Sequence, residues 1–281
     1  MIFARHHRLP LGVDIDADDV SIVAIEMRHT SLVVKAAQSS SLPRVNAAER
    51  DRAIVETLRG LRDDLALVER RCVIAAPLGE TLTRVFRPPP GMRPVEAERA
   101  AMFEADTFVA WPSRERLMAL DPIPDRSEYL LSVARTTAVE RATRLVKLAG
   151  LEPVAVDVPV CVWRRTATET DAVLDLRQDR AALFVFGDPL GIVERFPENS
   201  GDQLVTQLRA VLIQARRDGV ADVQRIVTVG QRERAAPIET ALGDDGYEAG
   251  PLTLGGATAP PWAFAYGLAN WAVLFRERPA A

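Results

Sequence analysis

The sequence contains few of the residues that form disulfides, metal sites or reactive centres. Cysteine occurs twice, as Cys72 and Cys161, and each lies within a run of apolar residues. Buried, reduced thiols explain both positions, because two distant cysteines provide neither a disulfide framework nor a zinc site. The three histidines, His6, His7 and His29, all lie within the first 29 residues. We therefore expect no metal ion.

Long hydrophobic runs and an excess of positive charge are also absent. No apolar run approaches the roughly 20 residues that cross a bilayer, and the opening residues do not read as a signal peptide. The formal net charge is -4, and no basic run is interleaved with aromatic residues, so nothing indicates a nucleic-acid surface. These features predict a cytoplasmic protein without a membrane span.

Short catalytic motifs are missing as well. The sequence has no Gly-x-Ser-x-Gly, no Walker sequence and no His-Glu-x-x-His. The acidic pair Glu96 and Glu98 has Arg93 and Arg99 beside it, which is typical of a salt-bridged surface helix. We expect no catalytic residues.

Two stretches of the chain share one order of predicted elements. Residues 12–25 read as a hairpin, followed by a strand at 32–36, an amphipathic helix at 48–68 and a buried strand at 72–76. Strands at 172–176, 181–186 and 191–196, a helix at 202–217 and a strand at 224–229 repeat this order. The order predicts an α/β protein of two related halves, of which the second is smaller.

Between the halves, residues 81–151 follow a different pattern. A strand at 82–86 leads to the proline-rich connector 88–94, an acidic helix, the Trp111-Pro112 corner, a strand at 129–134 and a helix at 137–149. Gly150 stands where a left-handed helix cap is needed, and a strand at 154–158 follows. We expect an inserted α+β subdomain.

Three of these segments together resemble PilM-type proteins, which are relatives of FtsA within the actin-like (ribonuclease H-like) fold. They are the opening hairpin from Leu11, the acidic helix that ends at Trp111-Pro112, and the helix–Gly150–strand unit. The resemblance extends from about Pro10 to about Leu274. It implies a first half at 10–80 and 151–168, the inserted subdomain at 81–150, and a second half at 169–275 that lacks most of its outer subdomain.

An active member of this fold holds nucleotide phosphates between two hairpin turns, where glycine allows the backbone to approach and aspartate orients magnesium. Asp14 and Asp175 keep the acidic positions, but Asp16 replaces the expected glycine, and bulky or charged residues fill both turns. Carboxylates that face a triphosphate would repel it. The turns therefore read as vestigial, with no cofactor.

A divalent-metal loop at Asp14, Asp16, Asp18 and Asp19 is the alternative, although the glycine and glutamate of a calcium loop are missing. Gly255-Gly256 reads as a plain loop.

The resemblance implies a non-catalytic scaffold of a type IV pilus, or related, assembly machine. Its partner would be a PilN-like inner-membrane protein whose short N-terminal peptide docks near the inserted subdomain, with other assembly subunits as further partners. The protein would then lie at the inner membrane through its partners. The candidate groove residues are apolar: Val85, Phe86, Phe103, Phe108, Trp111 and Leu130. Two alternatives remain at this point, namely the cytoplasmic part of a type II secretion assembly protein and an active actin-like ATPase.

Overall fold

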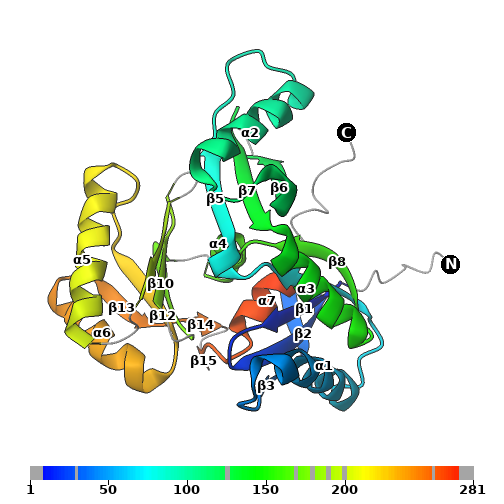
Figure 1. The fold of residues 1–281 in the computed structure, drawn as a ribbon. Coiled ribbons are helices and arrows are strands. Elements are labelled where there is room, and N and C mark those ends of the chain that lie inside the picture. The colour runs from blue at the N-terminus through cyan, green and yellow to red at the C-terminus, as the bar shows by residue number, and fades with distance from the viewer. Residues whose placement is uncertain are drawn as a thin grey trace.

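The computed structural model describes residues 9–28, 31–123, 127–167, 170–177, 181–187, 191–197, 201–254 and 257–271. His6, His7, His29 and Gly255-Gly256 lie outside these residues. The described chain folds into two halves, each built on a five-stranded sheet, with a smaller sheet above the first half (Figure 1).

The first sheet has the strand order β3-β2-β1-β4-β8. β1 lies at its centre, antiparallel to β2 and parallel to β4. Helix α1, capped by the Asn46 side chain, and helix α3 cover one face of the sheet, where Leu58, Ile74 and Val146 are buried together. The bounds are β1 (Leu11–Ile15), β2 (Asp19–Arg28), β3 (Ser31–Ser41), α1 (Ala47–Asp64), β4 (Arg71–Ala75), α3 (Thr136–Leu148) and β8 (Glu152–Asp157).

The second sheet repeats this arrangement with the order β11-β10-β9-β12-β13. β9 is antiparallel to β10 and parallel to β12, as β1 is to β2 and β4. The repeat of element order predicted from the sequence is therefore confirmed. The bounds are β9 (Ala172–Leu176), β10 (Ala181–Val185), β11 (Ile192–Phe196), α5 (Gly201–Arg217), β12 (Arg225–Gly230), α6 (Arg232–Asp244) and β13 (Glu248–Pro251); the short pair β14 (Thr253–Leu254) and β15 (Ala257–Thr258) follows.

Two short helices, α4 (Pro159–Thr166) and α7 (Ala263–Ala269), join the halves. Trp163 of α4 and Phe264 of α7 lie in one buried cluster with Val73 of the first sheet and Phe184 of the second. α7 lies directly on β1, because Gly12 has no side chain: a Cβ there would be 1.8 Å from the Ala265 carbonyl oxygen. This close approach holds α7 against the first sheet, while Phe264 and Leu268 of α7 belong to the cluster shared by both halves.

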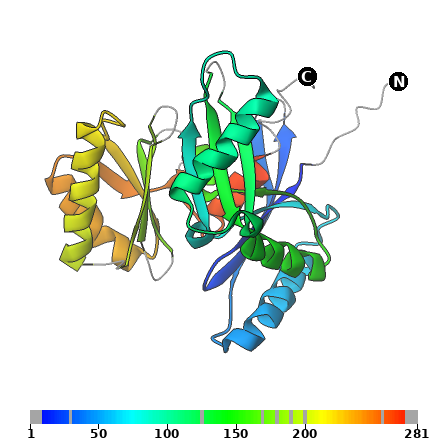
Figure 2. The same ribbon diagram turned by 45° about the horizontal axis from the view of Figure 1, so that its top comes forward.

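The small sheet has the order β5-β7-β6 and does not continue either large sheet. α2 (Pro94–Phe108) lies across one of its faces (Figure 2). Ala97, Ala101 and Ala105 form the buried ridge of α2 over Leu131 and Val133. The strands are β5 (Thr81–Phe86), β6 (Arg116–Pro122) and β7 (Tyr129–Arg135), and the short 3-10 turns η1 (Leu78–Glu80) and η2 (Ser113–Glu115) precede β5 and β6.

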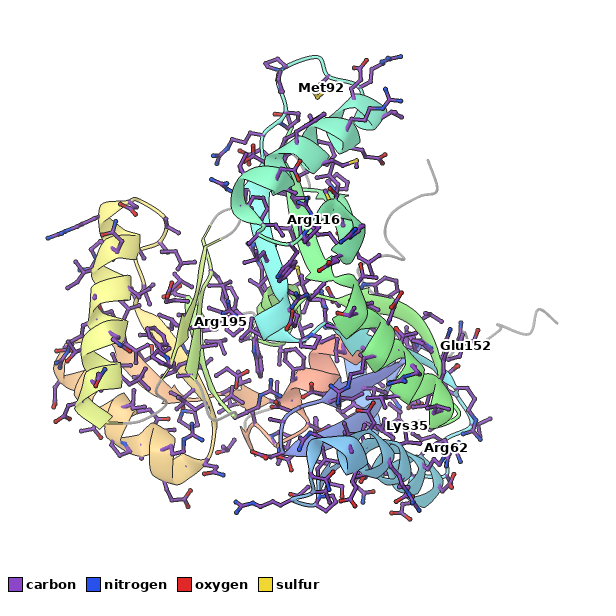
Figure 3. The ribbon with its side chains drawn as sticks, in the orientation of Figure 1. Lys35, Arg62, Met92, Arg116, Glu152 and Arg195 are labelled. Atoms are coloured by element: carbon purple, nitrogen blue, oxygen red, sulfur yellow. The ribbon has the colours of Figure 1, made fainter. Side chains whose placement is uncertain are left out.

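The helix that the sequence analysis placed in the inserted subdomain, α3, packs instead in the core of the first half. Leu145, Val146 and Ala149 join the cluster around α1 and β4. Arg62 of α1 donates to the Ala149 carbonyl at 2.8 Å and so caps the end of α3 (Figure 3 labels Arg62). Gly150 has a φ of 80°, as the left-handed cap requires. The separate sheet therefore occupies residues 81–135, and α3 returns the chain to the first half.

None of the helices in the described ranges is long and apolar enough to cross a membrane.

Candidate functional site

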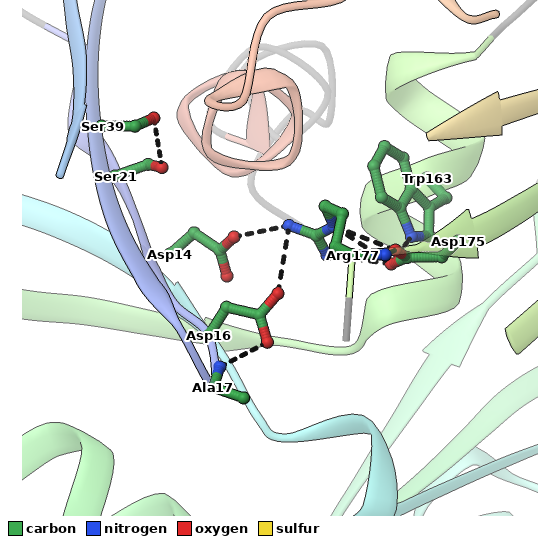
Figure 4. Close-up of polar contacts among 8 residues, drawn as sticks. All are labelled: Asp14, Asp16, Ala17, Ser21, Ser39, Trp163, Asp175 and Arg177. Atoms are coloured by element: carbon green, nitrogen blue, oxygen red, sulfur yellow. Dashed lines mark hydrogen bonds and ion pairs between the residues drawn. The ribbon is translucent and has the colours of Figure 1, made fainter. Parts of the chain in front are cut away.

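The first predicted turn follows β1 at the centre of the first sheet. Asp14 is only 7% exposed, because α7 and the neighbouring strands surround the end of β1. The turn closes through a hydrogen bond of 2.9 Å from the Asp16 backbone N–H to the Asp19 carbonyl. β1 therefore directs the Asp14 carboxylate into the space between the halves, and Asp16 lies beside it (Figure 4).

The second turn follows β9, the equivalent strand of the second half. Asp175 is buried, and its carboxylate accepts from the Trp163 indole N–H at 3.2 Å. It also accepts from the Arg177 backbone N–H at 3.1 Å, which folds the chain back after β9. Residues 178–180 of this turn lie outside the described ranges.

The Arg177 guanidinium connects the two turns. Its Nε and Nη2 donate to the Oδ1 and Oδ2 atoms of Asp175 at 3.0 and 2.9 Å, a two-pronged contact. Its Nη1 donates to Asp14 Oδ2 at 2.7 Å and lies 3.9 Å from Asp16 Oδ2 (Figure 4). One cation thus holds three carboxylates from both halves of the molecule.

Aromatic rings enclose the same guanidinium. Its carbon lies 5.0 Å from the ring centre of Trp163 and 4.7 Å from that of Phe264, within the range of cation–π attraction. The Arg177 side chain is 15% exposed. The cation is therefore held by charge, hydrogen bonds and ring contacts together.

The pKa values at this cluster reflect burial and charge. Burial, with the help of Asp16 and Asp175, raises the pKa of Asp14 to about 6, although Arg177 opposes this shift. Burial alone would lower the pKa of Arg177, but Asp175, Asp14 and Asp16 raise it well above its usual value. Arg177 is consequently a permanent cation.

A cavity of about 300 Å³ lies beside the cluster, between the halves. Asp14, Asp175 and Arg177 line it together with the η1 residues Leu78 and Gly79 and the β11 residue Arg195 (Figure 3 labels Arg195). The charged groups bordering the cavity already include an internal ion-pair network. In the described ranges, no group of three or more His, Cys, Asp and Glu side chains is arranged to hold a metal ion.

The end of β12 lies beside the second turn, because Gly230 pairs with Leu176 of β9. Gly230 approaches the backbone of Leu176 closely, since a Cβ there would lie 2.7 Å from the Leu176 carbonyl carbon. Thr228 donates to the buried carboxylate of Glu239, which also accepts from Arg232. The polar side chains at the end of β12 are therefore engaged in contacts with one another.

The predicted partner-binding residues divide into three places. Phe86 belongs to the core beneath α2, and Phe108 and Trp111 are partly buried there, under Arg84 and Arg135 respectively. Phe103 is 74% exposed on the outside of α2. Val85 and Leu130 are paired neighbours and point to the sheet face opposite α2. The six residues therefore do not line one groove.

Comparison with known proteins decides the family. The sequence profile of the type IV pilus assembly protein PilM matches residues 12–186. The chain belongs to the PilM family. The matched residues include the first half, the small sheet, and Asp175 and Arg177 of the second turn.

Solved structures agree with this assignment. A structure described as the PilM-PilN type IV pilus biogenesis complex superposes with a TM-score of 0.75 at 20% identity, covering 94% of this chain and 98% of that one. The cytoplasmic domain of EpsL, an inner membrane component of the type II secretion system of Vibrio cholerae, gives 0.55 at 12% identity, covering 94% of each chain. A Bacteroides thetaiotaomicron protein of unknown function with an actin-like ATPase fold gives 0.56 at 9% identity, covering 96% and 99%. No curated protein matches the sequence. These likenesses establish the actin-like fold.

The sequence alone assigns no role to Arg177 or Trp163. Arg177 is one of the bulky or charged residues that fill the turns, and Trp163 lies in the apolar run around Cys161. The available signal was an arginine two residues after the aspartate that ends a buried strand, but the second partner of this arginine, Asp14, is 163 residues away.

Proposed function

We propose that this PilM-family protein is a non-catalytic scaffold of type IV pilus assembly. The observation that carries the proposal is the position of Arg177 between the two turns that would hold nucleotide phosphates. Its guanidinium binds Asp14 and Asp175, the two carboxylates that would orient magnesium in an active relative. A nucleotide would have to displace this cation and face three buried or partly buried carboxylates, which repel phosphate.

The scaffold acts through a partner, a PilN-like inner-membrane protein whose short cytoplasmic segment binds in extended form. The likeness to the structure of a PilM-PilN complex over nearly the whole chain supports this partner. Binding would place the protein at the inner membrane.

The face of the small sheet opposite α2 is the proposed docking surface. Val85 and Leu130 are partly exposed on it, and Thr81 and Thr83 continue the same face along β5. A cavity of about 140 Å³ at its lower end is lined by Thr81 and Thr83 together with Pro159 and Val160 of α4. The second-half residues Phe184, Val193 and Arg195 line the same cavity. An extended segment that lies along this face would therefore contact the small sheet, α4 and the second half, and apolar pockets would select its side chains.

Calorimetric titration with the N-terminal cytoplasmic peptide of a PilN-like protein from the same organism tests the proposal. We expect saturable binding that Val85→Asp weakens at least about tenfold, because a carboxylate would be desolvated in the contact. Phe103→Ser, on the other side of α2, is the matched control and should leave the affinity unchanged. Trp111→Ala should act through stability, since Trp111 packs in the core beneath α2. Absence of peptide binding would contradict the scaffold role, and equal binding by Val85→Asp would contradict the placement.

A further inference from the structure

A second interaction surface lies on the opposite edge of the small sheet, beyond the proposed peptide site. β6 is the last strand in the order β5-β7-β6, and no described strand pairs with its outer edge. Between this edge and α2 runs a groove of about 350 Å³, lined by Glu98, Ala101 and Met102 of α2 and by Met118, Ala119 and Leu120 of β6. We propose that this groove binds an extended segment of a partner protein as an additional strand.

The pairing of β6 with β7 determines which backbone groups face outward. Ile123 N–H donates to the Glu128 carbonyl at 3.0 Å, and bonded and non-bonded pairs alternate along an antiparallel ladder. Met118 and Leu120 therefore direct their N–H and C=O groups to the open edge. The same two residues line the groove with their side chains, so one added strand would satisfy the backbone and fill the groove together.

The two sides of α2 differ in a way that favours this edge. On the β5 side, Arg84 lies 3.4 Å from Glu104 and 5.4 Å from the Phe108 ring centre, and so covers the gap. On the β6 side, Met102 is 55% exposed. Glu98 borders the groove there, and its carboxylate has no ion-pair partner among the described residues.

The order of groups along the groove specifies the segment. Asp106, near the end of α2, pairs with Arg116 at the start of β6, so the two elements run antiparallel (Figure 3 labels Arg116). Met102 consequently lies toward Met118, and Glu98 toward Leu120. The added strand should present an apolar side chain between the two methionines, which adapt readily to different shapes, and a lysine or arginine two residues on, beside Glu98.

A blocked fluorescent peptide, Thr-Val-Thr-Leu-Thr-Lys-Thr, is the probe, and a peptide with Glu in place of Lys is its control. Fluorescence anisotropy should show the Lys peptide binding about three- to fivefold more tightly than the Glu peptide. Met118→Pro removes an outward N–H but no bond to β7, and should weaken binding at least about tenfold. Glu98→Lys should weaken it by about three- to fivefold, in a salt-dependent manner.

Three controls make the outcome decisive. Glu233→Lys makes the same charge change on distant α6, and Leu117→Ser alters the other face of β6; both should bind as wild type does. Sedimentation velocity on the peptide-free protein tests whether a second copy occupies the edge.

Four results would each overturn the proposal: failure of the Lys peptide to bind, equal binding of both peptides, unchanged affinity of folded Met118→Pro, or a dimer that Met118→Pro dissociates. The PilN-like peptide should bind Met118→Pro normally, so the two surfaces are tested separately.

Discussion

At the scale of single residues, Arg177 holds the carboxylates of both halves. Its contacts to Asp14 and Asp175 are largely shielded from water, so each of these charges depends on the other for stability. In an active relative, a bound magnesium ion would balance the charge of these aspartates; here the Arg177 guanidinium supplies that positive charge. In the proposed scaffold role, this cluster would hold the two turns together without a bound nucleotide.

Removing this cation should destabilise the protein strongly. Arg177→Ala leaves Asp14 and Asp175 buried without a counter-charge, and we expect the free energy of unfolding to fall by about 3 kcal/mol. Urea denaturation at neutral pH measures the change. Arg216→Ala is the matched control, since its pair with Asp222 lies largely in solvent and should contribute less than about 1 kcal/mol. Equal, small effects of both substitutions would contradict the importance of the cluster.

Part of this site could be predicted from the sequence. Asp14 and Asp175 each end a recognisable buried strand, so their positions followed from the repeat of elements. The bridge could not be predicted, because it requires the relative placement of two turns 163 residues apart. The six predicted partner-binding residues were expected to line one groove, but they lie on different faces of the small sheet and of α2. Their apolar character alone does not show which face of the sheet each residue occupies.

At the scale of elements, strongly periodic or alternating segments were predicted to within a few residues. The first helix ends at Asp64 rather than residue 68, because the chain turns at Ala66, whose φ is 47°. β6, α4, α6 and α7 were not predicted. α7 is buried nearly all round and so has no polar face, and α6 contains Pro237 within the helix. These elements depend on the tertiary contacts that surround them.

Two glycines allow a test of how the elements pack. Gly12→Ala places a Cβ against the backbone of α7, and we expect a loss of at least about 2 kcal/mol in the free energy of unfolding. Gly60→Ala is the matched control on exposed α1, where no atom lies within 4 Å of the added Cβ. It should stabilise the protein by about 0.5–1 kcal/mol, because alanine favours the helix. Thermal and urea unfolding of both variants measure this difference in sign, and a Gly12→Ala variant as stable as wild type would contradict the close packing of α7 on β1.

At the scale of the whole molecule, one continuous core joins the halves. α4 and α7 pack against both sheets, and the charge cluster lies at the end of that core. The first half carries the small sheet, whose two sides provide the proposed docking surfaces. This arrangement fits the scaffold role proposed above, in which internal contacts rather than a bound nucleotide would maintain the shape of the protein.

Calorimetric titration of the wild-type protein with millimolar Mg-ATP tests this account most directly. Because Arg177 occupies the space between the turns and the three aspartates oppose phosphate, we predict no saturable heat. A dissociation constant in the micromolar range would show that a nucleotide displaces Arg177 from Asp14 and Asp175, and would contradict the proposed loss of the nucleotide site.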